Sequence, residues 1–166
     1  MKWISSNGGP LVVIEAERAS FWLGINGPSE SITHYQRACE INGYVGVLSV
    51  EGVDALILND EPLQSAWLSS DESSGIIVRW SYAETEEAVI DSLKGVHRAH
   101  FESAGLQFRI YGNLKMFDAG MPGDEPHESL DLKLVSGKYD VELCNFEPDS
   151  GTQLILIRLR RIGEFD

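Results

Sequence analysis

The sequence INGYVGVLSVEGVDALILNDEPLQSAW, residues 41–67, predicts the structural centre of this chain. Two apolar runs, residues 44–50 and 55–58, flank the short segment Glu51-Gly52-Val53-Asp54. Apolar runs of this length that are joined by a short connection containing glycine are typical of a β-hairpin. We therefore expect an antiparallel strand pair here, with Asp60-Glu61-Pro62 forming the turn by which the chain leaves it.

The same stretch lies in a segment whose charges have one sign. No lysine or arginine occurs between Arg37 and Arg79. The acidic residues in this interval are Glu40, Glu51, Asp54, Asp60, Glu61, Asp71 and Glu72. A surface with charges of one sign attracts an oppositely charged partner at long range. The hairpin region is therefore predicted to present an acidic face.

The whole chain is acidic. Its 166 residues include 26 Asp and Glu against 13 Lys and Arg, which gives a formal net charge of −13 at pH 7. Nucleic acids and anionic membranes are repelled by such a charge, so we expect neither as a partner. A hydrophobic content of 43% at this length is sufficient to bury the core of one folded domain.

The cysteines and the chain termini predict a cytoplasmic protein. Cys39 and Cys144 are too few and too far apart to indicate a disulfide framework, and the chain has no CxxC motif. Free thiols are typical of a reducing compartment. The first residues lack an apolar segment of signal-peptide length, and the longest apolar runs have the length of strands.

One helix is predicted with clear signals, over about residues 82–95. Val89, Leu93 and Val96 fall on one stripe at helical spacing, acidic residues precede them, and Gly95 suits the helix end. Most other apolar runs are short and rich in β-branched residues, which favours strands. The predicted fold class is α+β: a single β-rich domain, residues 1–166, of mostly antiparallel sheets.

The two halves of the chain show a weak similarity to each other. The order and rough spacing of strands and turns in residues 1–82 correspond to those in residues 98–166, and Gly43-Tyr44-Val45 aligns with Gly137-Lys138-Tyr139. These correspondences suggest the hypothesis of two duplicated half-modules, with the predicted helix as the main connection between them.

Motifs for catalysis and for metal binding are sparse. His97 and His100 have a spacing that can chelate a metal from one helical face, but no further ligands accompany them. The acidic loop at residues 118–128 lacks the spacing of an EF-hand. We therefore predict no metal, no cofactor and no catalytic residue. Two alternatives remain open: a small hydrolase that uses Cys39 or a His/carboxylate site, and a small-ligand-binding regulatory module.

Four motifs in the first 70 residues or so resemble the immunity protein 21 family, whose members are antitoxins encoded beside toxins of bacterial polymorphic toxin systems. In order, they are WISSNGGPL at residues 3–11, WLG at 22–24, YQRACE at 35–40 and DEPL at 60–63. The resemblance implies an α+β protein without catalytic activity, which protects the producing cell by binding a cognate toxin. WLG and DEP are compatible both with structural positions and with contacts.

The charge pattern and the resemblance together predict a binding surface for a basic toxin domain. A nuclease is the hypothesised target, because a basic substrate channel would attract an acidic binder. Trp67 is a candidate anchor, since tryptophan is favoured at the centre of interfaces. The predicted contact residues are Asp60, Glu61, Trp67, Asp71 and Glu72, with Asp118, Asp124 and Glu125 from the second half.

Overall fold

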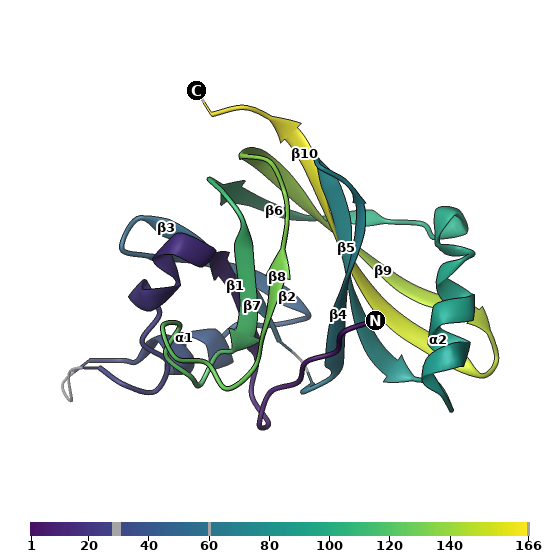
Figure 1. The fold of residues 1–166 in the computed structure, drawn as a ribbon, viewed down its shortest axis with the longest axis horizontal. Helices are drawn as coiled ribbons and strands as arrows, with labels where there is room; N and C mark the ends of the chain where they lie inside the picture. Colours follow the sequence, from purple (N-terminus) through teal and green to yellow (C-terminus); the bar gives the residue numbers. More distant parts are fainter. Residues whose placement is uncertain (28–30, 60, 166) are drawn as a thin grey trace.

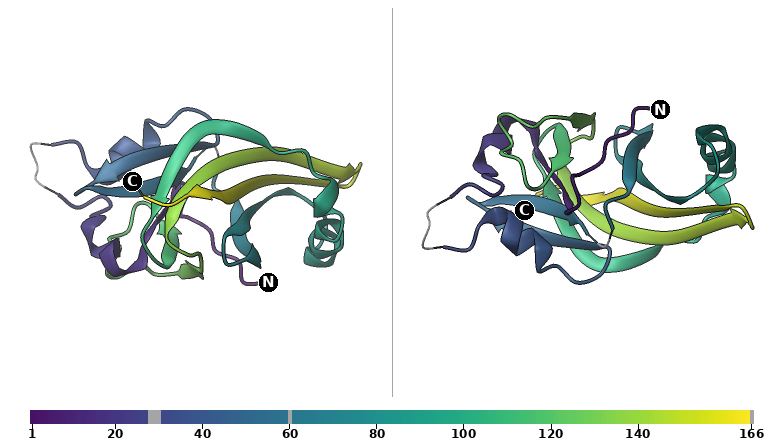
Figure 2. Two further views of the ribbon diagram at one scale, coloured as in Figure 1. Left: turned by 90° about the horizontal axis from the view of Figure 1, so that it is seen from above. Right: turned by 90° about the horizontal axis from the view of Figure 1, so that it is seen from below.

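The computed structural model describes residues 1–27, 31–59 and 61–165. Within these residues, two five-stranded antiparallel sheets pack against each other, and the helices lie on their outer faces (Figure 1). The first sheet has the strand order β2-β3-β1-β7-β8, and the second has the order β4-β5-β10-β9-β6. Helix α2 covers the second sheet, on the side of the molecule away from α1, as both views in Figure 2 show.

The bounds of the elements are as follows. The strands of the first sheet are β1 (Leu11–Glu15), β2 (Val45–Val50), β3 (Val53–Leu58), β7 (Leu114–Asp118) and β8 (Ser129–Leu132). Those of the second are β4 (Gln64–Asp71), β5 (Ser74–Tyr82), β6 (Glu102–Ile110), β9 (Gly137–Asp149) and β10 (Thr152–Gly163). The helices are α1 (His34–Cys39), α2 (Glu86–Leu93) and the 3-10 helices η1 (Ala16–Phe21) and η2 (Val96–Arg98).

The predicted hairpin is the β2–β3 pair. Val50 pairs with Val53, so Glu51 and Gly52 form a two-residue turn, with φ values of 50° and 79°. Positive φ at both central residues is typical of a type I′ turn, whose twist matches that of the two strands. The predicted helix is α2, which begins after Thr85, because the Thr85 hydroxyl accepts a hydrogen bond from the backbone N–H of Ala88.

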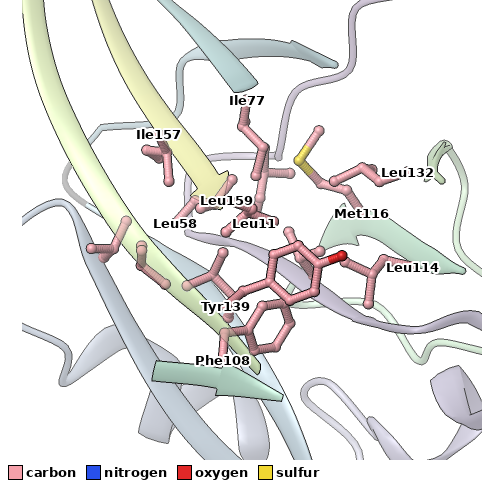
Figure 3. Close-up of a cluster of buried hydrophobic side chains, with 14 of the residues drawn as sticks. Leu11, Leu58, Ile77, Phe108, Leu114, Met116, Leu132, Tyr139, Ile157 and Leu159 are labelled. Carbon is pink, nitrogen blue, oxygen red and sulfur yellow. The ribbon is translucent and has the colours of Figure 1, made fainter. Parts of the chain in front are cut away.

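The alternation of side chains along the strands creates three apolar clusters. Leu56 and Leu58 of β3 face the second sheet and meet side chains such as Phe108 and Tyr139 in the inter-sheet core (Figure 3). The intervening Ile57 faces the opposite way and packs with the helices that cover the first sheet. The third cluster lies between the second sheet and α2. The inner faces of both sheets are therefore buried against each other, and helices cover part of each outer face.

Each sheet contains strands from both halves of the chain. β1, β2 and β3 share the first sheet with β7 and β8, while β4 and β5 share the second with β6, β9 and β10. The predicted class, an α+β fold with mostly antiparallel sheets, is confirmed. The strand order does not support the hypothesis of duplicated half-modules. β1 lies beside β3, whereas its counterpart β6 lies beside β9, which corresponds to β2.

We propose that residues 1–166 fold as one cooperative domain, because neither half contains a complete sheet. Separately produced fragments 1–82 and 98–166 should each lack the near-UV circular dichroism signal of fixed aromatic packing. The intact chain should give one urea transition that is the same by fluorescence and by circular dichroism. A fragment that folds alone, or two separate transitions in the intact chain, would contradict the proposal.

One ion pair connects the two sheets where β3 lies near β6. The carboxylate of Asp54 accepts hydrogen bonds from the backbone N–H of Arg109 (3.0 Å) and from its Nε (3.0 Å) and Nη2 (2.6 Å). These bonds, together with the charge of Asp54, raise the pKa of Arg109 above its ordinary value. The side chain of Asp54 is only 8% exposed, so its charge is compensated by Arg109 inside the fold.

Asp54→Ala should lower the free energy of unfolding by about 2 kcal/mol, because it removes the shared acceptor of these charge-assisted hydrogen bonds. Urea denaturation followed by tryptophan fluorescence measures the change. Asp131→Ala, on an exposed position of β8, is the control and should alter the stability by less than about 0.5 kcal/mol. Equal effects of the two substitutions would show that the pair adds nothing to stability.

Candidate partner-binding surface

Several connections meet at the end of the first sheet where β1 begins. Leu11 pairs with Leu58 on one side and with Asp118 on the other. The segments that precede β1, follow β3 and follow β7 therefore lie side by side, at the bottom of Figure 1. We call this end the loop face and define it by residues 7–10, 22–25, 32–40, 61–62 and 118–128.

The glycine-proline segment before β1 is fixed by its neighbours. The ring of Tyr35 lies over Gly9, where an added Cβ would come within 2.5 Å of the Tyr35 hydroxyl oxygen. The carboxylate of Asp118 accepts hydrogen bonds from the backbone N–H groups of Asn7 (2.9 Å) and Gly120 (2.8 Å). A side chain at Gly9 would therefore require the Tyr35 ring to move from its present position.

The Trp22-Leu23-Gly24 motif joins the η1–α1 connection to the loop after β7. Trp22 is fully buried, and its Nε1 donates to the carbonyl of Ala119 (2.8 Å). Gly24 has a φ of +62°, and a Cβ there would lie 2.5 Å from the carbonyl oxygen of Gly120. The first and third residues of the motif thus have structural roles, while Leu23 is 41% exposed.

A buried arginine holds the connection that contains Glu61. Arg79, on β5, donates from Nη1 to the carbonyl of Asn59 (2.5 Å) and from Nη2 to the carbonyl of Glu61 (2.6 Å). Its Nε donates to the hydroxyl of Ser65 (3.3 Å). A buried guanidinium requires such acceptors, because its desolvation is costly. Arg79 therefore fixes the path of the chain at Glu61.

The predicted acidic contact residues occupy opposite ends of the molecule. Glu61, Asp118, Asp124 and Glu125 lie on the loop face, whereas Asp71 and Glu72 lie at the turn between β4 and β5. The eight residues of β4 separate the two groups by about 25 Å. Asp60, which the charge pattern also indicated, lies outside the described residues.

Asp71 has a local role at its turn. Its carboxylate accepts hydrogen bonds from the backbone N–H of Ser73 (2.6 Å) and from the Ser73 hydroxyl (2.8 Å), and these bonds lower its pKa. This pattern is typical of an aspartate that stabilises a tight turn. Asp71 is exposed, but it is not part of the loop face.

Trp67 lies on β4, between the two acidic groups. It packs against the inter-sheet core, and its ring occupies the space in which a side chain at Gly75 would lie. Its indole Nε1 is buried and has no hydrogen-bond partner among the described residues. This position suits packing between the sheets.

His34 and Cys39 each form a hydrogen bond with a different residue of the loop face. Nδ1 of His34 accepts a hydrogen bond from the backbone N–H of Leu23 (3.0 Å). The side chain of Cys39 is hydrogen-bonded to that of Tyr35. This hydrogen bond is the largest of the effects that raise the pKa of the Tyr35 phenol. The hollow that contains Cys39 has a volume of about 130 Å³, and its described lining includes no histidine. These residues give no support to a cysteine hydrolase.

The described residues do not select either of the remaining alternatives. His100 lies 3.8 Å from Glu102 beside a hollow of about 640 Å³, but both side chains are largely exposed. No group of three or more His, Cys, Asp or Glu in this part of the chain is placed to hold a metal ion. The hollow between α2 and the β9–β10 turn, about 780 Å³, lies outside the two sheets and is lined by mixed charged and apolar groups. No helix that the structure describes is sufficiently long and apolar to cross a membrane.

The comparison with protein families decides the relationship that the motifs suggested. The model of the family described as Immunity protein 21 matches residues 2–152 of the 166-residue chain. The chain belongs to this family. The match covers the whole loop face, where residues from separate motifs of this immunity protein 21 member contact each other, as Gly9 and Gly24 do with Tyr35. No curated protein and no solved structure matches the chain.

Acidification should weaken the loop face through His34. Burial lowers the pKa of His34, Arg37 lowers it further, and the charge of Glu51 opposes both. The imidazole must lack a proton at Nδ1 to accept the Leu23 N–H, so the folded chain disfavours its protonation. The resulting stability is fully present above the unfolded-state pKa of about 6.5 and is lost as the pH falls through the lower folded-state pKa.

His34→Asn tests this effect, because the asparagine Oδ1 can replace Nδ1 as an acceptor but does not titrate. Urea denaturation at pH 7, 6 and 5 should show a larger loss of stability for the wild type than for the variant. Parallel pH profiles of the two proteins would mean that His34 does not contribute to the dependence.

Proposed function

We propose that this chain neutralises a cognate bacterial toxin by binding it directly through the loop face. Membership of the immunity protein 21 family supports an immunity function. The observation that carries the finer proposal is that Glu61, Asp118, Asp124 and Glu125 gather with the family motifs at one end of the fold. The shared location of acidic groups and motifs favours this end over the β4–β5 turn.

The charge of the loop face suits a basic partner. Arg37 is the one lysine or arginine of the loop face, and its Nη2 donates to the carbonyl of Ser49 (3.2 Å). The acidic residues that the structure describes there are Glu40, Glu61, Asp118, Asp124, Glu125 and Glu128. Such an imbalance accelerates the encounter with a positively charged surface. A toxin with a basic substrate channel, such as a nuclease, is the target that we propose.

The proposed mechanism is occlusion without bond-making or bond-breaking by this chain. The loop face is held by buried groups, including Arg79 and Trp22, so its backbone loses little freedom when a partner binds. Cys39 and Cys144 are free thiols, which suits the cytoplasm that we propose as the site of protection.

Glu61→Lys combined with Glu125→Lys should slow association with the toxin domain encoded beside this chain by about ten-fold at low salt, with a smaller effect at high salt. Both side chains are exposed, so the fold should persist. Biolayer interferometry at two salt concentrations measures the rates, and co-expression with the toxin measures protection.

The matched control is Glu72→Lys combined with Glu147→Lys. It changes the net charge by the same amount at exposed positions outside the loop face, and its association rate should remain close to that of the wild type. Equal slowing in the two double variants would indicate a general effect of net charge. An unaltered rate in the loop-face variant would place the interface elsewhere.

A further inference from the structure

Residues 19–36 contain unusually few charged residues for this acidic chain. In the sequence ASFWLGINGPSESITHYQ, the only residue that is Asp, Glu, Lys or Arg is Glu30. At the average of the whole chain, 23% of 18 residues, about four charged residues would occur here. Low charge in a segment of this length is typical either of burial or of the centre of an interface.

Burial does not explain the apolar side chains of this segment. Trp22 is buried, but four other large apolar side chains are exposed. They are Phe21 (38% exposed), Leu23 (41%), Ile25 (63%) and Ile32 (60%). We call these four residues the apolar patch. Single exposed apolar residues are ordinary on protein surfaces, but several in one short connection, with Glu30 as the only charged residue between them, indicate an interaction site.

Backbone hydrogen bonds hold the described parts of this connection together. The backbone N–H of Tyr35 donates to the carbonyl of Gly24 (3.2 Å), and that of Leu23 donates to Nδ1 of His34 (3.0 Å). Leu23 and Ile25 therefore lie beside the start of α1. Ile32 is two residues before the first residue of this helix. Helix α1, at whose start these segments meet, lies on the left of Figure 1.

The acidic loop after β7 borders this segment. The backbone N–H of Ile25 donates to the carbonyl of Gly120 (3.1 Å), and that of Gly123 donates to the carbonyl of Trp22 (2.9 Å). Asp124 and Glu125, both exposed, follow directly. An uncharged apolar centre beside a charged, solvent-accessible margin is the usual composition of a protein–protein interface.

We propose that the apolar patch is the central contact of the toxin interface and that the loop from Asp118 to Glu125 is its rim. This inference rests on the function proposed above and specifies the matching surface of the toxin: an exposed apolar or aromatic spot surrounded by lysine and arginine. The acidic rim selects this occupant. A second copy of this chain would place the same acidic rim in the contact, which like charges oppose.

The two parts of the surface have separable effects on binding kinetics. Charges at a rim act at a distance and change the association rate, whereas apolar groups act only after water has been excluded from the contact. Loss of the apolar groups therefore changes mainly the dissociation rate. This difference distinguishes the central contact from the rim in one experiment.

Ile25→Ser combined with Ile32→Ser should accelerate dissociation of the toxin domain at least about ten-fold and leave the association rate within about three-fold of the wild type. The control is Ile90→Ser combined with Ile162→Ser, which removes the same groups at positions that are 39% and 45% exposed on α2 and β10. The control should bind as the wild type does. Circular dichroism melting curves verify that both variants fold.

Each outcome decides the inference. Wild-type dissociation kinetics in the Ile25/Ile32 variant would overturn it and leave the proposed function standing. Failure of the wild-type chain to bind the toxin domain would overturn the proposed function and this inference together. Self-association of the wild type in sedimentation experiments, abolished by the same substitutions, would assign the apolar patch to a contact between copies and would also overturn the inference.

Discussion

The passage of the chain from one sheet to the other depends on a buried guanidinium. β3 ends in the first sheet and β4 begins in the second, and Arg79 bonds to the carbonyls of Asn59 and Glu61 on the connection between them. A guanidinium that leaves water must have its donors satisfied, so the positions of Asn59 and Glu61 that bring their carbonyls to Arg79 are favoured. The same bonds fix Glu61 at the edge of the loop face. Arg79 therefore contributes both to the passage between the sheets and to the geometry of the candidate surface.

Local signals allowed part of this fold to be predicted. The β2–β3 hairpin and α2 were found because each has its signal within a few consecutive residues: a two-residue turn at Glu51-Gly52 in one, and an apolar stripe after an N-cap in the other. α1 was missed because a six-residue helix is too short to show periodicity, and its main signal is the capping box between Thr33 and Gln36. β4 shows no clear local signal, because its second half is polar: these residues form the exposed end of an edge strand and lead into a tight turn. No local signal indicates that strands of the two halves share both sheets.

The charge pattern could suggest that acidic groups form a surface, but it could not say which of them lie together. Glu61 and Asp71 are ten residues apart in sequence, yet the extended backbone of β4 carries them to opposite ends of the second sheet. Asp118 is far from both in sequence and reaches the loop face only because β7 pairs with β1. Asp54 belongs to the same acidic stretch but is neutralised by Arg109. These differences arise from strand pairing between distant segments, which composition and spacing do not specify.

Burial divides the Trp22-Leu23-Gly24 motif into fixed and exposed positions, and this division bears on the proposed binding of a toxin. Trp22 and Gly24 are fixed by contacts with the loop after β7, whereas Leu23 between them and Ile25 beyond point outward. Substitution at the buried positions would disturb the whole loop face, because each makes a contact that no other side chain can replace. Substitution at the exposed positions would leave those contacts intact and change only what the surface offers to a partner. Residues 22–25 can therefore keep one backbone conformation while their exposed side chains differ, and this separation is the property that a toxin-binding scaffold requires if its partner is to vary.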